Sequence, residues 1–259
     1  MTIRANGTWA DKVYLFGGNN GCDASATATA ERIDFSSYPF PSRQTIDPLV
    51  APVEQNNVAV LPDGKMLVVG GRGDGANNYR YQMYSRDGRR TLLVESPVPR
   101  HDHSTLHLMP DASVWVMGGN RVNLTADPSR PQTQAERDLA VPVLERYKPP
   151  YFFKWHRRPV IEKNPSLLRY GEEFKVDVSS GDIGSVVLLR TGPTTHNWSW
   201  GNQYVSLPYT KQTKKRVQLT VTAPHLPGLA IPGDYLLFVV STGGVPSEGK
   251  HIFLQKSSH

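Results

Sequence analysis

The sequence has almost no cysteine and no long apolar run. Cys22 is the single cysteine among 259 residues, so a disulfide bond within the chain is excluded. No apolar stretch approaches the roughly 18 residues that a membrane-spanning helix needs. The N-terminal stretch Met1–Lys12 also lacks the apolar core of a secretory signal. We therefore expect no membrane-spanning segment, and these residues leave the compartment unknown.

Several catalytic and binding motifs are missing as well. The sequence shows no Ser-His-Asp order, no Cys-x-x-Cys pair and no phosphate-binding loop, since Gly70–Gly73 lacks the Lys-Ser/Thr that such a loop requires. The net charge is +6, but its basic clusters are not interleaved with aromatic residues along one face. We interpret the clusters as solvated turns between strands and expect no nucleic-acid partner.

Glycine and proline are abundant, and part of the glycine is periodic. The chain contains 22 Gly and 21 Pro, which favours a turn-rich, all-β protein. Gly-Gly doublets that start at Gly17, Gly70 and Gly118 each close an apolar run, and their successive spacings are 53 and 48 residues. Pro-Asp-Gly at residues 62–64 and Pro-Asp-Ala at residues 110–112 precede the last two runs and predict hairpin turns.

A repeat of about 50 residues that contains a strand ending in Gly-Gly is typical of a kelch-type propeller blade. Glycine allows the inner strands to approach one another closely and to turn at that point. We therefore predict a partial kelch-type β-propeller of about three blades over residues 1–148. Propellers close with about 4–8 blades, so we expect another protein chain or self-association to complete the ring.

The repeat stops near Pro159, and shorter β-rich runs follow. Their spacing and number are typical of an immunoglobulin-like (E-set) β-sandwich, which we assign to residues 149–259. The whole chain is thus predicted to be all-β with almost no helix. The expected strands lie at residues 174–178, 185–190, 204–207, 217–222, 235–240 and 251–255.

Several motifs resemble the C-terminal part of the galactose oxidase and glyoxal oxidase family, the copper radical oxidases. The resemblance implies the last blades of a seven-bladed propeller followed by an immunoglobulin-like domain. The matching motifs are Arg100-x-x-His103-Ser104, Glu145-x-Tyr147-x-Pro149-Pro150-Tyr151, Tyr170-Gly171-x-x-Phe174, Leu189-Arg190-x-Gly192-x-x-Thr195-His196, Pro232-Gly233-x-Tyr235-x-Leu237-Phe238-Val239 and Gly244-Val245-Pro246-Ser247.

The resemblance also implies a copper site. His103, at the start of the last blade, and His196, on a loop of the C-terminal domain, match the two copper histidines of the family. Imidazole suits Cu(II). Asp102 stands where the family has an axial tyrosine, and it is the nearest candidate for a third ligand. The Cys–Tyr radical cofactor of the family has no counterpart here, so no catalytic residue is assigned. His101, Asp102 and His103 together are an alternative metal site.

Three residues near these ligands are candidates for substrate binding. Arg100 offers charge to an anionic or polyol substrate, and Trp198 and Trp200 offer faces that stack on sugars or cations. The alternatives are structural. Arg100 pairs with Asp102 or with a neighbouring backbone carbonyl, and the two tryptophans pack the loop against the propeller.

Two functions follow from this interpretation. The first is a galactose/glyoxal-oxidase-like piece that supplies two copper ligands, with alcohol or aldehyde oxidation only when missing blades or a partner chain complete it. Its ligands would be a carbohydrate or a small alcohol or aldehyde, and the resemblance implies an extracellular location. The second is a non-catalytic binding or assembly module that keeps the oxidase fold. Asp102 favours the second, and the pair His103 and His196 favours the first.

Overall fold

The computed structural model describes residues 2–4, 11–19, 25–37, 39–73, 79–101, 103–120, 131, 133–134, 140–155, 157–179, 182–190, 192, 194–195, 198–199, 201–213 and 217–256. Every named element in these ranges is a β-strand, except one short 3-10 helix, η1 (Pro150–Phe153). The all-β prediction is therefore confirmed for this part of the chain. No helix within it has the length and apolar character needed to cross a bilayer.

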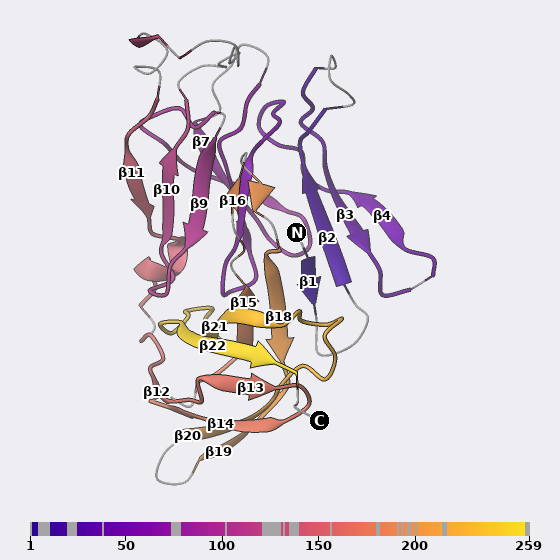
Figure 1. The fold of residues 1–259 in the computed structure, drawn as a ribbon, viewed down its shortest axis with the longest axis vertical. Helices are drawn as coiled ribbons and strands as arrows, with labels where there is room; N and C mark the ends of the chain where they lie inside the picture. Colours follow the sequence, from indigo (N-terminus) through magenta and orange to yellow (C-terminus); the bar gives the residue numbers. More distant parts are fainter. Residues whose placement is uncertain are drawn as a thin grey trace.

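Three antiparallel meanders follow one another in the N-terminal part, and Figure 1 shows them as one tier above the C-terminal strands. The first two have four strands each, and the third has three among the described residues. The strands coincide with the apolar runs and hairpin turns expected from the repeat. Their bounds are β1 Thr2–Arg4, β2 Asp11–Phe16, β3 Ala30–Asp34, β4 Ser42–Thr45, β5 Asn57–Val60, β6 Met66–Val69, β7 Arg80–Tyr84, β8 Arg90–Glu95, β9 Ser104–Leu108, β10 Val114–Gly118 and β11 Leu144–Tyr147.

The glycine doublets stand where neighbouring meanders meet. Gly70 and Gly71 have φ values of 68° and 107°, which L-residues rarely adopt. The N–H of Gly71 donates to the carbonyl of Arg100 at 3.0 Å, and the N–H of Gly18 donates to that of Val53 at 2.8 Å. Each of these bonds joins one meander to the loop that leads into the next. Close backbone approach thus explains the doublets, while the kelch type of the meanders remains a prediction.

The C-terminal strands form a two-sheet sandwich. One sheet has the order β12-β14-β20-β19, and the other contains β13-β22-β21-β15-β18. A separate two-stranded hairpin, β16–β17, lies in the connection between β15 and β18. The bounds are β12 Ile161–Lys163, β13 Leu167–Arg169, β14 Glu173–Val178, β15 Ser185–Arg190, β16 Thr194–Thr195, β17 Trp198–Ser199, β18 Gln203–Leu207, β19 Tyr209–Thr213, β20 Val217–Thr222, β21 Gly233–Val240 and β22 Lys250–Gln255.

Strand β15, at the centre of its sheet, is buried on both faces. Val186 and Leu188 point into the interior of the sandwich, whereas Val187 and Leu189 belong to the core shared with the meanders. Successive residues of a strand face opposite sides. This burial explains why residues 186–189 are an unbroken apolar run instead of an alternating one.

This sheet also continues into the first meander. β1 pairs with β18 in parallel, with Ile3 opposite Tyr204, which gives a nine-stranded sheet. The sequence did not predict this pairing. The guanidinium of Arg86, on the turn after β7, stacks 4.5 Å from the ring centroid of Tyr204 and donates to its hydroxyl. The division of the chain into residues 1–148 and 149–259 remains a prediction.

We predict that Gly70→Ala lowers the free energy of unfolding by at least about 2 kcal/mol. The left-handed conformation costs an L-residue about 1–2 kcal/mol, and a Cβ at Gly70 would overlap the carbonyl oxygen of Arg100. Urea unfolding followed by tryptophan fluorescence measures the loss. Gly228→Ala is the control, because a Cβ there meets nothing within 4 Å. Equal losses in both variants would contradict this account of the doublets.

Candidate functional site

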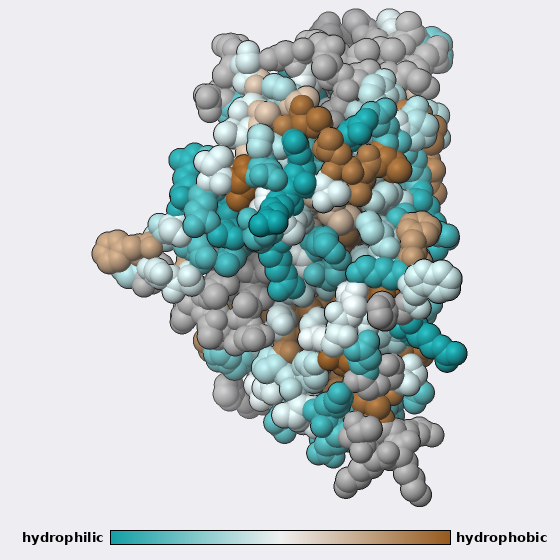
Figure 2. All heavy atoms as spheres, turned by 180° about the vertical axis from the view of Figure 1, so that it is seen from behind, coloured by the Kyte–Doolittle hydropathy of each residue, from teal (hydrophilic) through white to brown (hydrophobic). Residues whose placement is uncertain are grey.

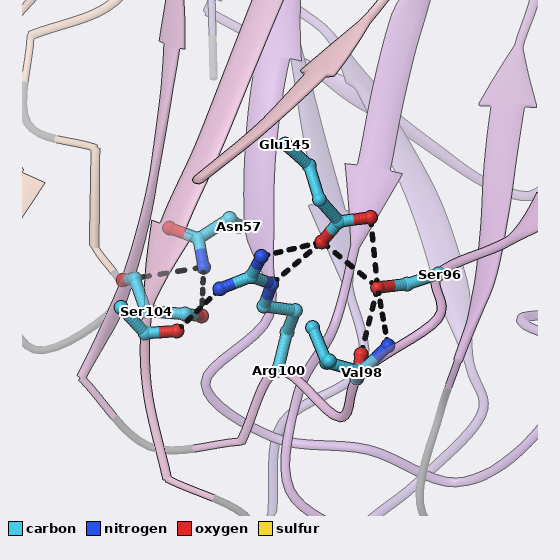
Figure 3. Close-up of polar contacts among 7 residues, drawn as sticks. Asn57, Ser96, Val98, Arg100, Ser104 and Glu145 are labelled. Carbon is cyan, nitrogen blue, oxygen red and sulfur yellow. Dashed lines mark hydrogen bonds and ion pairs between the residues drawn. The ribbon is translucent and has the colours of Figure 1, made fainter. Parts of the chain in front are cut away.

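The beginnings of β5 and β9 lie side by side and are joined by buried polar groups. Asn57, the first residue of β5, donates from Nδ2 to the hydroxyl oxygen of Ser104, the first residue of β9, at 2.8 Å. The Ser104 hydroxyl in turn donates to the carbonyl of His101 at 3.2 Å. Figure 3 shows Asn57 and Ser104 facing each other across the two meanders. These bonds link Ser104 to His101 and hold the starts of β5 and β9 together.

Arg100 is the most buried charge of this corner, with 1% of its side chain exposed. Its Nε donates to Oε2 of Glu145, on β11, at 2.8 Å, and Nη2 contacts the same oxygen. Its Nη1 donates to the carbonyl of Gly118 at 2.8 Å. The hydroxyl of Ser96 lies 2.9 Å from Oε2 and 3.0 Å from Oε1 of Glu145 (Figure 3). The guanidinium therefore joins the loop before β9 to the ends of β10 and β11.

Two tyrosines in contact with each other stay neutral, and one of them, Tyr81, lies beside this ion pair. Burial, reinforced by the Glu145 carboxylate, raises the pKa of Tyr81. Burial raises the pKa of Tyr147 to about 12. The two rings meet edge to face, with centroids 5.2 Å apart. Because both phenols keep their protons at neutral pH, Arg100 and Glu145 supply the charge of this cluster.

His103 is presented to solvent directly before β9. Its side chain is exposed, and its φ of 58° lies in the left-handed region. A residue with a Cβ rarely adopts this conformation unless its surroundings impose it. The bonds of Arg100 and Ser104 on either side of His103 provide that constraint.

The hairpin β16–β17 reaches from the sandwich to strands β9 and β5. Strand β16 lies against β9, and β17 lies against β5. Figure 1 shows the hairpin among the N-terminal strands, apart from the sandwich that it leaves. Asn202 holds its base, because its Oδ1 accepts from the N–H of Gly192 at 2.9 Å and its Nδ2 donates to the carbonyl of Val58 at 3.3 Å. The structure thus brings a C-terminal loop to the strand that follows His103.

The structure describes some of the predicted site residues but not all of them. His103 stands at the corner as described. Asp102, His196 and Trp200 lie outside the described residues, and Trp198 is described only as backbone of β17. Among the described residues no cluster of three or more His, Cys, Asp or Glu side chains is able to hold a metal ion. The copper ligand set therefore stays a prediction.

The geometry of Arg100 favours its structural alternative. The guanidinium is directed at Glu145 and at the carbonyl of Gly118, a neighbouring backbone carbonyl of the kind expected for that alternative. No pattern in the sequence indicates Glu145, Asn57 or Ser96 as partners in this cluster. Glu145 and Arg100 occur in two of the resembling motifs, but 45 residues separate them, so no local spacing indicates their pairing.

Comparison with known proteins places this fold in a class. Residues 158–254 match the family model described as galactose oxidase-like, early set domain. A solved structure described as a novel fungal alcohol oxidase of the AA5 family, in complex with copper, superposes with a TM-score of 0.81 over 98% of this chain and 54% of that chain. Its sequence identity is 23%, so it shows the fold alone. The described part of the chain is all-β, and its fold resembles that of the galactose oxidase type.

Two curated proteins are similar to this chain in sequence. The aldehyde oxidase GLOX of Vitis pseudoreticulata is 31% identical over 219 residues, which cover 76% of this chain and 40% of that protein. A galactose oxidase of Gibberella zeae is 25% identical over 252 residues, which cover 91% of this chain and 35% of that protein. The predicted resemblance to the galactose oxidase and glyoxal oxidase family is confirmed. The chain spans less than half the length of both relatives.

We predict that Glu145→Gln lowers the free energy of unfolding by about 3 kcal/mol, because it leaves the guanidinium of Arg100 buried without a counter-charge. Thermal and urea unfolding measure the loss. Glu95→Gln is the matched control, since Glu95 pairs with Arg80 at the surface, where an ion pair contributes at most about 1 kcal/mol. If both variants lose the same amount, the buried pair does not stabilise the corner.

Proposed function

We propose that this chain supplies two histidine ligands, His103 and His196, to a copper site in a galactose/glyoxal-oxidase-like protein. The observation that carries the proposal is the contact of hairpin β16–β17 with β9 and β5. His103 directly precedes β9, and His196 follows Thr195, the last residue of β16. In the proposal, the loop that follows β16 and the start of β9 meet at a single corner.

The donor chemistry fits copper. Imidazole nitrogens are strong ligands for Cu(II), and a carboxylate oxygen completes a tetragonal N/O set. In the proposal His103 and His196 provide the imidazoles, and Asp102 provides the carboxylate. Bound copper supplies one-electron redox chemistry, whereas oxidation of an alcohol or aldehyde removes two electrons. A second redox centre is therefore required, and this sequence shows no counterpart of the family's radical cofactor.

The ligand of such a site would be a carbohydrate or a small alcohol or aldehyde. The names of the relatives, galactose oxidase and aldehyde oxidase, support this class. In the proposal Trp198 and Trp200 stack on the ligand, since both follow the loop of His196 closely. An extracellular location is part of the same proposal.

A non-catalytic binding or assembly module is the second candidate function. Asp102 favours it, because a carboxylate cannot replace the redox and proton chemistry of the tyrosinate at that position of the family. The module would keep the fold and the metal corner, and would hold a ligand or a partner chain without oxidising it.

In either case we propose that another chain, or a second copy of this one, covers the outer meanders. Tyr14 packs toward the second meander, whereas its neighbour Leu15 points the other way and is 44% exposed. Leu144, on β11, is 53% exposed and lies across from Met117. Figure 2 shows apolar patches reaching the surface on the rear face. A meander normally buries such a face against its neighbour.

We predict that the copper-loaded chain binds Cu(II) through both histidines and produces no hydrogen peroxide from galactose, glycerol or glyoxal. Calorimetric titration should show at least about ten-fold weaker binding in His103→Ala and in His196→Ala, because each variant removes one of few ligands. His251→Ala is the control, since His251 pairs with Asp234 on the sandwich surface.

Unchanged copper affinity in either histidine variant would overturn the proposed site. Peroxide production by the isolated loaded chain, lost in His196→Ala, would show instead that a second redox centre is present.

We predict self-association or capture of a partner at micromolar concentration, because the outer meander faces expose apolar surface. Sedimentation velocity measures the state. Leu15→Glu and Leu144→Glu should each reduce association, and Val160→Glu, an equally exposed apolar position on the sandwich, serves as the control. A monomer that binds no hydrophobic dye would contradict the proposal.

A further inference from the structure

Gln55 occupies the position in the second meander that His103 occupies in the third. The two residues are 48 positions apart, which is also the spacing from Gly70 to Gly118. Both adopt left-handed conformations, with φ values of 54° and 58°. A left-handed residue before the first strand of the meander is therefore a repeated feature of this fold.

Gln55 combines two features that oppose folding. Its side-chain oxygen Oε1 is buried and accepts no hydrogen bond from the described residues. A buried acceptor without a donor destabilises the folded state, and the left-handed backbone adds strain. Glycine would remove both at once. Local departures of this kind are expected at functional sites, where a ligand supplies what the fold leaves out.

The position of Gln55 indicates which site it serves. Strands β5 and β9 begin side by side, as the bond between Asn57 and Ser104 shows. Gln55 precedes β5 by two residues, and His103 directly precedes β9. The hairpin β16–β17 lies against both strands. Gln55 and His103 therefore stand at the same end of two neighbouring strands.

We propose that Gln55 is a ligand-binding residue of this corner, and that its amide oxygen accepts a hydrogen bond from a hydroxyl group of the bound molecule. The inference rests on the proposed function for the presence of that molecule. An amide oxygen is an acceptor with two lone pairs, and a hydroxyl is the donor it lacks. A site with a buried acceptor of this kind rejects analogues without the hydroxyl. Gln55 thus selects an alcohol, a sugar or a hydrated aldehyde.

The effect of replacing Gln55 on the melting temperature tests whether this residue destabilises the fold. Gln55→Gly removes the strain and the unpaired oxygen, so the melting temperature of the full chain should rise. Gln82→Gly is the matched control, because the amide oxygen of Gln82 accepts from the N–H of Val50 at 2.9 Å, and its loss should lower the melting temperature. A fall in Gln55→Gly would show that Gln55 serves the fold, and it would overturn the inference.

Ligand binding tests the second half. D-galactose and glycerol are titrated calorimetrically into the copper-loaded wild type and into Gln55→Leu, which keeps the size of the side chain and removes the acceptor. The loss of one hydrogen bond should weaken binding about five-fold. Gln82→Leu should bind both probes as the wild type does. Equal affinity in Gln55→Leu and wild type, or no binding by the wild type, would overturn the inference.

The outcomes separate this inference from the proposed function. Copper titration of His103→Ala reports on the metal site and does not involve Gln55. If copper binding proves independent of His103 while Gln55→Gly is stabilised and Gln55→Leu loses the sugar, the hydroxyl site stands without the metal site. If copper binding depends on His103 while the Gln55 variants bind the sugar normally, the metal site stands and the role of Gln55 fails.

Discussion

Burial of the central strands of one sheet on both faces holds the two parts of this chain together. Strands β15, β18 and β21 send alternate residues into the sandwich and into the meanders, so neither core is closed without the other. Phe238 and Val239 show the division within two residues of β21, since the first belongs to the shared core and the second to the sandwich. The contact of Arg86 with Tyr204 adds a polar link at the same boundary.

That sheet also determines where the candidate site can form. The connection from β15 to β18 carries the hairpin β16–β17, and both strands that anchor it are held by the two cores. The base of the hairpin is bonded to Val58 through Asn202. The path of the hairpin toward β5 and β9 is therefore imposed by the fold, and a ligand bound there would meet a preformed corner. Preorganisation of this kind lowers the cost of binding.

The sequence predicted the parts of this fold that depend on local pattern. Apolar runs, Gly-Gly doublets and Pro-Asp turns specify strands and hairpins through side-chain period and backbone conformation, and those strands were found where expected. It did not predict the parallel pairing of β1 with β18, or the ion pair of Arg100 with Glu145. Both join segments far apart in the chain, and no spacing rule connects them.

For the candidate site, too, the sequence predicted residues that belong to a motif and missed features that depend on contacts between distant segments. The resemblance singled out His103 by its motif, but its left-handed conformation follows from contacts of Arg100, Ser104 and Asn57 that appear only after folding. Gln55 carries no motif at all. Two properties of the folded chain single it out: its φ agrees with that of His103, and its Oε1 accepts no hydrogen bond from the described residues.

The contacts that shape the corner around Arg100 are independent of whatever covers the outer meanders of the propeller. A buried ion pair adds little net stability, because desolvation offsets much of its attraction, but it fixes geometry when its hydrogen bonds are satisfied. Arg100 fixes the corner by bonding to β10 and β11 at once, all within the third meander. The apolar residues Leu15 and Leu144 lie on the outer meanders instead. The proposed metal and hydroxyl sites would lie at this corner, whereas the proposed oxidation would depend on what covers those outer faces.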